Sequence, residues 1–203
     1  MRWQNVYNAD QTLPETKSVN EYLDKMHPYL TICENKKILE IGPYNGVHTQ
    51  VIKSHNPKSI TLVELYEQAL IALKLVHPEC EIVENDIFHY LDKPRDFDVV
   101  VCCGVLYHLH APLYLLELIV NRVSPQFICI ESFDAGLNTN QEDDNIPGAR
   151  QLAPEWKSAN ISIKLPKEII ITAMQNLGYK LNVYDDSMVK LGTRPYFCVF
   201  EKI

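Results

Sequence analysis

The stretch ILEIGPYNGVHT, Ile38–Thr49, decides the fold of this 203-residue chain. Its first four residues are apolar apart from Glu40, which is typical of a buried β-strand that ends in an acid. Gly42 then begins a turn, and Gly46 opens a helical pattern. Glycines at a strand end let the backbone come close to a ligand. The stretch therefore predicts a strand, a ligand-binding turn and a helix in succession.

The glycine spacing of this stretch argues against a dinucleotide cofactor. A dinucleotide-binding turn follows the pattern G-x-G-x-x-G, with small residues where the pyrophosphate meets the helix N-terminus. Counted from Gly42, the second and third glycine positions hold Tyr44 and Val47. The spacing favours a ligand without phosphates that lies over the strand ends, where the strand order of the sheet reverses.

Outward from this stretch, short apolar runs alternate with helical patterns, which predicts a parallel sheet. The run Asp96–Gly104 is apolar enough to be buried on both faces, so we place it in the centre of the sheet. The last two runs are separated by a short turn and can pair as an antiparallel hairpin. We expect an α/β fold with five parallel strands, over Lys36–Gly42, Ser59–Leu65, Cys80–Glu84, Asp96–Gly104 and Gln126–Ser132, and a hairpin of Tyr179–Asp185 and Arg194–Ile203.

The length of the chain predicts a single domain over residues 1–203. Before the first strand, Ser18 and Glu21 form a capping-box pattern that predicts the start of a helix. We interpret residues 1–35 as an N-terminal helical lid or brace in front of the core.

The composition argues against several partners and settings. The formal net charge of the chain is −7, so its overall electrostatic field does not attract the phosphates of a nucleic acid. This argues against nucleic acid as the partner. No apolar stretch approaches the roughly 20 residues that span a bilayer, and the polar start lacks the layout of a signal peptide. The six cysteines form no C-x-x-C pair and read as reduced core residues. We therefore expect a cytoplasmic protein with no membrane partner.

The pattern E-x-G-x-x-x-G of Glu40, Gly42 and Gly46 resembles the adenosylmethionine-binding motif of class I methyltransferases. The resemblance extends over most of the chain. It implies a Rossmann-like, doubly wound sheet of seven strands in the order 3-2-1-4-5-7-6. It also implies S-adenosyl-L-methionine as cofactor, with S-adenosyl-L-homocysteine as the product. Pro43 and Tyr44 lie within the motif and are expected to bind the cofactor together with its glycines.

The same resemblance assigns most of the other cofactor contacts. Glu64, in TLVELY, takes the place of the acid that accepts hydrogen bonds from both ribose hydroxyls, with Leu65 beside it. Asp86 takes the place of the acid that accepts from the adenine amino group, and the backbone N–H of Ile87 meets the ring. Capping a short helix is the alternative role of Asp86. Glu40 is expected to orient the methionine ammonium, since a buried carboxylate needs a partner.

The segment GVLYH, Gly104–His108, resembles a branch of the family that includes a tRNA wobble-uridine carboxymethyltransferase and many small-molecule methyltransferases. Cys103 and Gly104 are expected to pass beneath the methionine part of the cofactor. In this branch Tyr107 and His108 lie on the loop that faces the transferred group, where a neutral imidazole takes the acceptor's proton. The alternative for His108 is that it braces the loop or the cofactor.

A polar loop over residues 133–160 is expected to cover the acceptor side, because its length is typical of a functional loop. Arg150 offers a fork for a carboxylate or phosphate of the acceptor, and Trp156 offers a large apolar surface. The alternatives are an ion pair between Arg150 and the acidic run 142–144, and a Trp156 that pins the loop to the core. We expect no metal for two reasons. Cys103 ends the fourth strand at the position where a metal-assisted site would have an acid, and the acidic run is interpreted as part of a solvated loop.

The sequence thus predicts an adenosylmethionine-dependent methyltransferase that acts on oxygen or carbon of a small-molecule acceptor. GVLY replaces the Asn/Asp-Pro-Pro-aromatic signature of enzymes that methylate exocyclic amines of bases, which disfavours that chemistry. One alternative is a tRNA-modifying (carboxy)methyltransferase, indicated by the GVLYH segment. Another is a non-catalytic partner subunit that binds adenosylmethionine and supports a second methyltransferase.

Overall fold

The computed structural model describes residues 13–134, 165–187 and 195–203. Within them one sheet has the order β3-β2-β1-β4-β5-β7-β6. Its strands are β1 (Lys37–Ile41), β2 (Ser59–Glu64), β3 (Glu81–Glu84), β4 (Val99–Cys103), β5 (Phe127–Phe133), β6 (Tyr179–Asp185) and β7 (Pro195–Lys202). Strands β1 to β5 are parallel, and β7 is antiparallel to both of its neighbours. The fold and the strand order expected from the sequence are confirmed.

The strand order reverses between β1 and β4. The chain runs outward from β1 through β2 to β3 and then returns to pair β4 with the other side of β1. In open α/β sheets, ligands bind outside the carboxyl ends of the strands at such a reversal. We call the carboxyl ends of β1, β2, β4 and β5, with the loops that follow them, the strand-end region.

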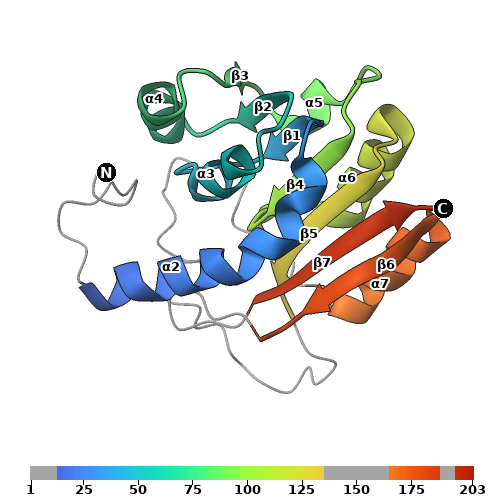
Figure 1. The fold of residues 1–203 in the computed structure, drawn as a ribbon. Coiled ribbons are helices and arrows are strands. Elements are labelled where there is room, and N and C mark those ends of the chain that lie inside the picture. The colour runs from blue at the N-terminus through green and yellow to red at the C-terminus, as the bar shows by residue number, and fades with distance from the viewer. Residues whose placement is uncertain (1–12, 135–164, 188–194) are drawn as a thin grey trace.

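Helices cover both faces of the sheet, with the long helix α2 crossing in front of it (Figure 1). Because successive side chains of a strand point to opposite faces, Val99 and Val101 pack in one apolar cluster and Val100 in the other. The first cluster lies under α2 (Leu13–Met26), the 3-10 helix η1 (His27–Cys33), α3 (Val47–Ser54) and α4 (Glu67–Val76). The second lies under α5 (Ile87–Tyr90), the 3-10 turn η2 (Leu106–His108), α6 (Pro112–Leu118), the π-helical turn η3 (Ile119–Val123) and α7 (Lys167–Asn176).

Two helices differ from the sequence expectation. Helix α2 begins at Leu13, so the Ser18 capping pattern lies inside the helix and does not mark its start. The apolar spacing of Leu113, Leu116, Val120 and Val123 predicts a helix over Ala111–Val123, but the chain is α-helical only to Leu118 and then continues as a π-helical turn. A π turn inserts an extra residue into the helical repeat, which a periodic apolar pattern does not reveal.

Two further sequence expectations can be compared with the described residues. All six cysteines are free thiols; five of them are buried in the core as expected, and Cys80 is half-buried. No helix in the described ranges combines the length and the apolar character needed to cross a bilayer.

Candidate functional site

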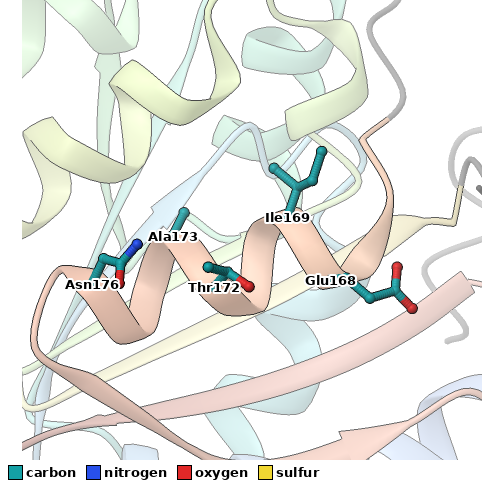
Figure 2. Close-up of a pocket in the computed structure, with 5 residues that line it drawn as sticks. All are labelled: Glu168, Ile169, Thr172, Ala173 and Asn176. Atoms are coloured by element: carbon teal, nitrogen blue, oxygen red, sulfur yellow. The ribbon is translucent and has the colours of Figure 1, made fainter.

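The sheet brings the expected site residues together from distant parts of the chain. Glu40 and Glu64 lie at the ends of the neighbouring strands β1 and β2, and Cys103 ends β4 on the other side of β1. A surface depression elsewhere is lined by Glu168, Ile169, Thr172, Ala173 and Asn176, all from helix α7 (Figure 2). A ligand site normally has walls from several elements. The strand-end region is therefore the better candidate.

Glu40 is a buried carboxylate, 2% exposed, with one oxygen engaged. Its Oε2 accepts a hydrogen bond of 2.6 Å from the Thr49 hydroxyl of α3, whereas its buried Oε1 has no hydrogen-bond partner among the described residues. The pKa of Glu40 is raised to about 7, chiefly by burial and also by the nearby charge of Glu64, and the hydrogen bond from Thr49 offsets part of the rise. An unused buried carboxylate oxygen fits a ligand that carries a cationic donor, such as an ammonium group.

The glycines of the turn after β1 are required by packing as well as by backbone conformation. Gly42 and Gly46 both take positive φ, 61° and 72°, which disfavours a side chain. A Cβ on Gly42 would lie 2.8 Å from Val105 Cγ2, and one on Gly46 would lie 2.4 Å from His77 Nε2. Gly46 thus makes room for His77, whose Nε2 lies 3.0 Å from the Gly46 carbonyl oxygen. The sequence had indicated only that these glycines let the backbone come close to a ligand, and it did not reveal the contact between Gly46 and His77.

Glu64 anchors the turn of β1 to the end of β2. Its Oε2 accepts from the backbone N–H of Tyr44 at 2.9 Å, and its Oε1 accepts from those of Leu65 and Tyr66 at 2.8 and 2.9 Å. A carboxylate offers about four acceptor positions, so this set leaves capacity for a ligand hydroxyl. Of the other motif residues, Pro43 is buried.

Exposed apolar side chains lie next to Glu64 in the chain and in the turn that it holds. Leu65 is 63% exposed and Tyr44 is 53% exposed. The rings of Tyr44 and Tyr66 are nearly parallel, with centroids 6.2 Å apart. Apolar and aromatic surface next to a few polar groups is the usual lining of a small-molecule site.

Asp86 takes the capping role that was its alternative reading. It precedes α5, and its Oδ1 accepts from the backbone N–H of Phe88 at 2.8 Å. Ile87, the next residue, is buried in the core. Capping uses one carboxylate oxygen of Asp86, so a second contact from Oδ2 to a ligand stays compatible with this geometry.

The loop after β4 holds the residues expected near the reaction. Gly104 has a φ of 76°, and a Cβ there would lie 3.4 Å from the Tyr107 hydroxyl. Tyr107 and His108 sit on η2, half-buried, with ring centroids 4.4 Å apart. Burial lowers the pKa of His108 to about 4, and burial together with the charge of Glu131 raises the pKa of Tyr107 far above its ordinary value. At neutral pH the imidazole is therefore uncharged and the phenol keeps its proton.

Three buried polar residues in this region were missed by the sequence reading. Glu131, on β5, is 0% exposed, and Tyr22 of α2 and His48 of α3 are also buried. The Tyr22 hydroxyl lies 3.0 Å from His48 Nε2. Burial raises the pKa of Tyr22, and the charge of Glu131 raises it further. A signal was available for Glu131, because it is the single charge in the apolar run FICIESF.

Other expected site features lie outside the described residues. Arg150, Trp156 and the acidic run 142–144 belong to the undescribed range 135–164, as does almost all of the expected acceptor-side loop. Among the described residues, no group of three or more His, Cys, Asp or Glu side chains is placed to hold a metal ion.

The strand order, the C-terminal antiparallel strands and the acids at the ends of β1 and β2 define a class, the Rossmann-like methyltransferases. A sequence profile described as a methyltransferase domain matches residues 16–181. The chain belongs to this family. The expectation of a class I methyltransferase is confirmed.

Solved structures share this fold at low sequence identity. Magnesium protoporphyrin IX methyltransferase from Synechocystis PCC 6803, with bound S-adenosylmethionine, has a TM-score of 0.69 and 9% identity, and the match covers 100% of this chain and 90% of that one. A second match is the 1,6-didemethyltoxoflavin-N1-methyltransferase of Burkholderia thailandensis, solved with 1,6-didemethyltoxoflavin and S-adenosylhomocysteine. It has a TM-score of 0.64 and 13% identity, and the match covers 98% of this chain and 84% of that one.

A curated relative acts on RNA. The tRNA U34 carboxymethyltransferase of Trichodesmium erythraeum (strain IMS101) is 27% identical over 112 residues, which cover 51% of this chain and 33% of the relative. The chain therefore matches about a third of that relative's length.

Proposed function

We propose that this chain transfers a methyl group from S-adenosyl-L-methionine to oxygen or carbon of a small-molecule acceptor, with S-adenosyl-L-homocysteine as the product. The observation that carries the proposal is the pair of buried carboxylates at the ends of β1 and β2. Glu40 has a buried oxygen without a hydrogen-bond partner among the described residues, and Glu64 retains acceptor capacity. These groups suit an ammonium and a ribose, which are two polar parts of the cofactor.

The residues of the chain have distinct tasks in this proposal. Glu64 accepts from the ribose hydroxyls, and Glu40 accepts from the ammonium. Asp86 and the backbone N–H of Ile87 meet the adenine, while Cys103 and Gly104 lie beneath the methionine part. Pro43 and Tyr44, with the glycines of the turn, complete the cofactor contacts.

The chemistry asks little of the protein beyond alignment. Adenosylmethionine, when bound, supplies an activated methyl group. The chain must hold the acceptor in line with it and exclude water. His108 is uncharged at neutral pH because burial lowers its pKa to about 4, and in this proposal its imidazole takes the proton of an acceptor hydroxyl as methyl transfer makes that proton acidic. Tyr107 stays protonated and donates a hydrogen bond that orients the acceptor.

The charge of the chain supports a small acceptor. A net charge of −7 opposes the approach of a polyanion. The solved Burkholderia enzyme with a similar fold has the small molecule 1,6-didemethyltoxoflavin bound. We extend the acceptor pocket to Arg150 and Trp156, which would contact an acidic group and an apolar part of the acceptor.

Calorimetry on the full chain tests the proposal. We expect saturable heats with adenosylmethionine and adenosylhomocysteine, and none with NADH. Glu64→Ala should weaken the affinity for both adenosyl ligands by about 100-fold, because the charge-assisted hydrogen bond to the ribose is lost together with the three that hold the turn. The matched control is Glu67→Ala, an exposed acid at the start of α4, which should leave both affinities unchanged. Absence of heat with either adenosyl ligand would overturn the proposal.

Transfer to tRNA is the second candidate, supported by the GVLYH segment and by the curated tRNA relative. Incubation with methyl-labelled adenosylmethionine and a cell extract separates the two, because label enters either the tRNA fraction or the small-molecule fraction. We expect label in small molecules. Cofactor binding without label in any fraction would instead support a non-catalytic partner subunit.

A further inference from the structure

Glu131 is a fully buried carboxylate that has no task in the proposed function so far. It lies on β5 directly opposite Cys103 of β4, and its backbone carbonyl accepts from the N–H of Gly104 at 3.0 Å. Because side chains alternate along a strand, Glu131 shares a face with Cys129, which packs with Cys103 in the cluster under α2 and α3. That face also holds Glu40, two residues beyond Ile38 of the same cluster.

The Glu131 carboxylate reaches the backbone beneath the expected methionine part of the cofactor. Its Oε2 lies 3.6 Å from the position that a Cβ on Gly104 would occupy. Burial is the main cause that raises the pKa of the Cys103 thiol, and the charges of Glu131 and Glu40 raise it further. The end of β4 therefore lies in the combined field of two buried carboxylates, one from each neighbouring strand.

This charge pattern matches the methionine end of the methyl donor. Adenosylmethionine carries two cationic groups there, the ammonium and the sulfonium, whereas adenosylhomocysteine keeps only the ammonium. Opposite charges a few ångströms apart attract much more strongly in a partly buried site than in water. One carboxylate on each side of β4 offers a counter-charge to each of the two groups.

We propose, building on the proposed function, that Glu131 is the residue that recognises the sulfonium charge, while Glu40 serves the ammonium. Glu131 then makes the site prefer the methyl donor over its neutral-sulfur product. It also disfavours a sulfonium whose transferred group bears a carboxylate, because two negative charges would face each other. Glu131 is in this way a determinant of donor specificity.

Calorimetry with two ligands and two isosteric variants tests this assignment. Glu131→Gln should lower the affinity for adenosylmethionine by tenfold or more, because one attraction between opposite charges is lost. The affinity for adenosylhomocysteine should change by less than about threefold. Glu40→Gln is the matched control, since it neutralises the carboxylate on the other side of β4. Glu40→Gln should lower the affinity for both ligands by the same factor, because both ligands carry the ammonium.

The outcomes separate this inference from the proposed function. Heats with neither ligand on the wild-type chain overturn both. Heats with both ligands, but an equal effect or no effect of Glu131→Gln on the two affinities, overturn the assignment of Glu131 and leave the methyltransferase proposal standing.

A measurement on the wild-type chain keeps the test valid if thermal melting shows that Glu131→Gln does not fold. An adenosylhomocysteine analogue with a protonated amine in place of the thioether sulfur should then bind about tenfold more tightly than adenosylhomocysteine. A carboxymethyl sulfonium should bind more weakly than adenosylmethionine. The reverse of either order overturns the assignment.

Discussion

The two halves of the strand-end region are built in different ways. At the ends of β1 and β2, Glu64 holds the backbone of Tyr44, Leu65 and Tyr66, so the site is made largely of main chain from residues 40–66. At the ends of β4 and β5, the polar groups are side chains brought from α2, α3, η2 and β5.

The difference shows how each half depends on sequence. A site made of main chain needs glycines and a few acids at fixed local spacing, and a short motif specifies it. A site made of side chains from remote elements depends on the packing of the whole domain. We therefore expect changes in the first half to cost more stability than changes in the second half, where His108 acts on turnover and Glu131 on donor affinity.

The largest effect should come from Gly46→Ala. The new Cβ would meet His77 Nε2 at 2.4 Å and force an alanine to keep a φ of 72°. Strain and overpacking together should cost roughly 2–5 kcal/mol of unfolding free energy, measured by denaturant titration. Gly178→Ala is the control: its φ is 86°, but a Cβ there meets nothing within 4 Å. If both variants lost the same stability, the His77 contact would have no role.

The next effect concerns the pH dependence of stability in Glu40→Gln. The folded-state pKa of Glu40 is about 7, above its ordinary value of 4.5, because burial disfavours the charge. The wild-type chain therefore loses stability as pH rises through the window from about 4.5 to 7. The variant lacks this group, so its stability relative to wild type should rise by about 3 kcal/mol between pH 4 and 8. Parallel stability curves would contradict the buried, proton-binding Glu40.

A smaller effect is expected for His108→Gln, in the second half of the region. Turnover should fall about 10–100-fold through loss of the proton acceptor, while the affinity for adenosylmethionine stays within about threefold. Because burial lowers the pKa of His108 to about 4, protonation of this residue should reduce wild-type activity only as pH falls toward 4. Steady-state kinetics across pH measures both effects. A variant that lost affinity and kept turnover would place His108 on the cofactor.

The smallest effect should come from Tyr22→Phe. This change removes the buried hydrogen bond between Tyr22 and His48, which should cost about 1 kcal/mol of unfolding free energy. Thermal melting of the variant against wild type measures it. A loss as large as that of Gly46→Ala would show that the side-chain half supports the fold as strongly as the main-chain half.

Much of the fold could be predicted because its signals are local. Apolar runs of strand length, with helical patterns between them, predicted β1, β2, β3 and β5 to within one residue at each end, whereas β4 begins at Val99 and not at the expected Asp96. The acid and glycine spacing of Glu40, Gly42 and Gly46 is equally local. The family that these residues indicated is the one whose profile matches the chain.

The features that were missed depend on contacts between distant residues. Nothing near Gly46 in the sequence points to His77, and nothing near Tyr22 points to His48. Glu131 was read as part of a core strand because its apolar neighbours dominate the pattern. A charge in such a run has to find its environment in other elements, and that environment is known only once the fold is formed.

The position of β7 has a consequence for synthesis of the chain. Strand β7 is the last of the described strands to be made, yet it lies between β5 and β6 and pairs with both. Until Pro195–Lys202 leaves the ribosome, one edge of β5 is open and rich in apolar residues, a template for wrong pairing with other chains. At 5–20 residues per second, the 62 residues from Phe133 to Pro195 (195 − 133) take roughly 3–12 s to translate. Nascent chains stalled in that interval should be unusually dependent on chaperones.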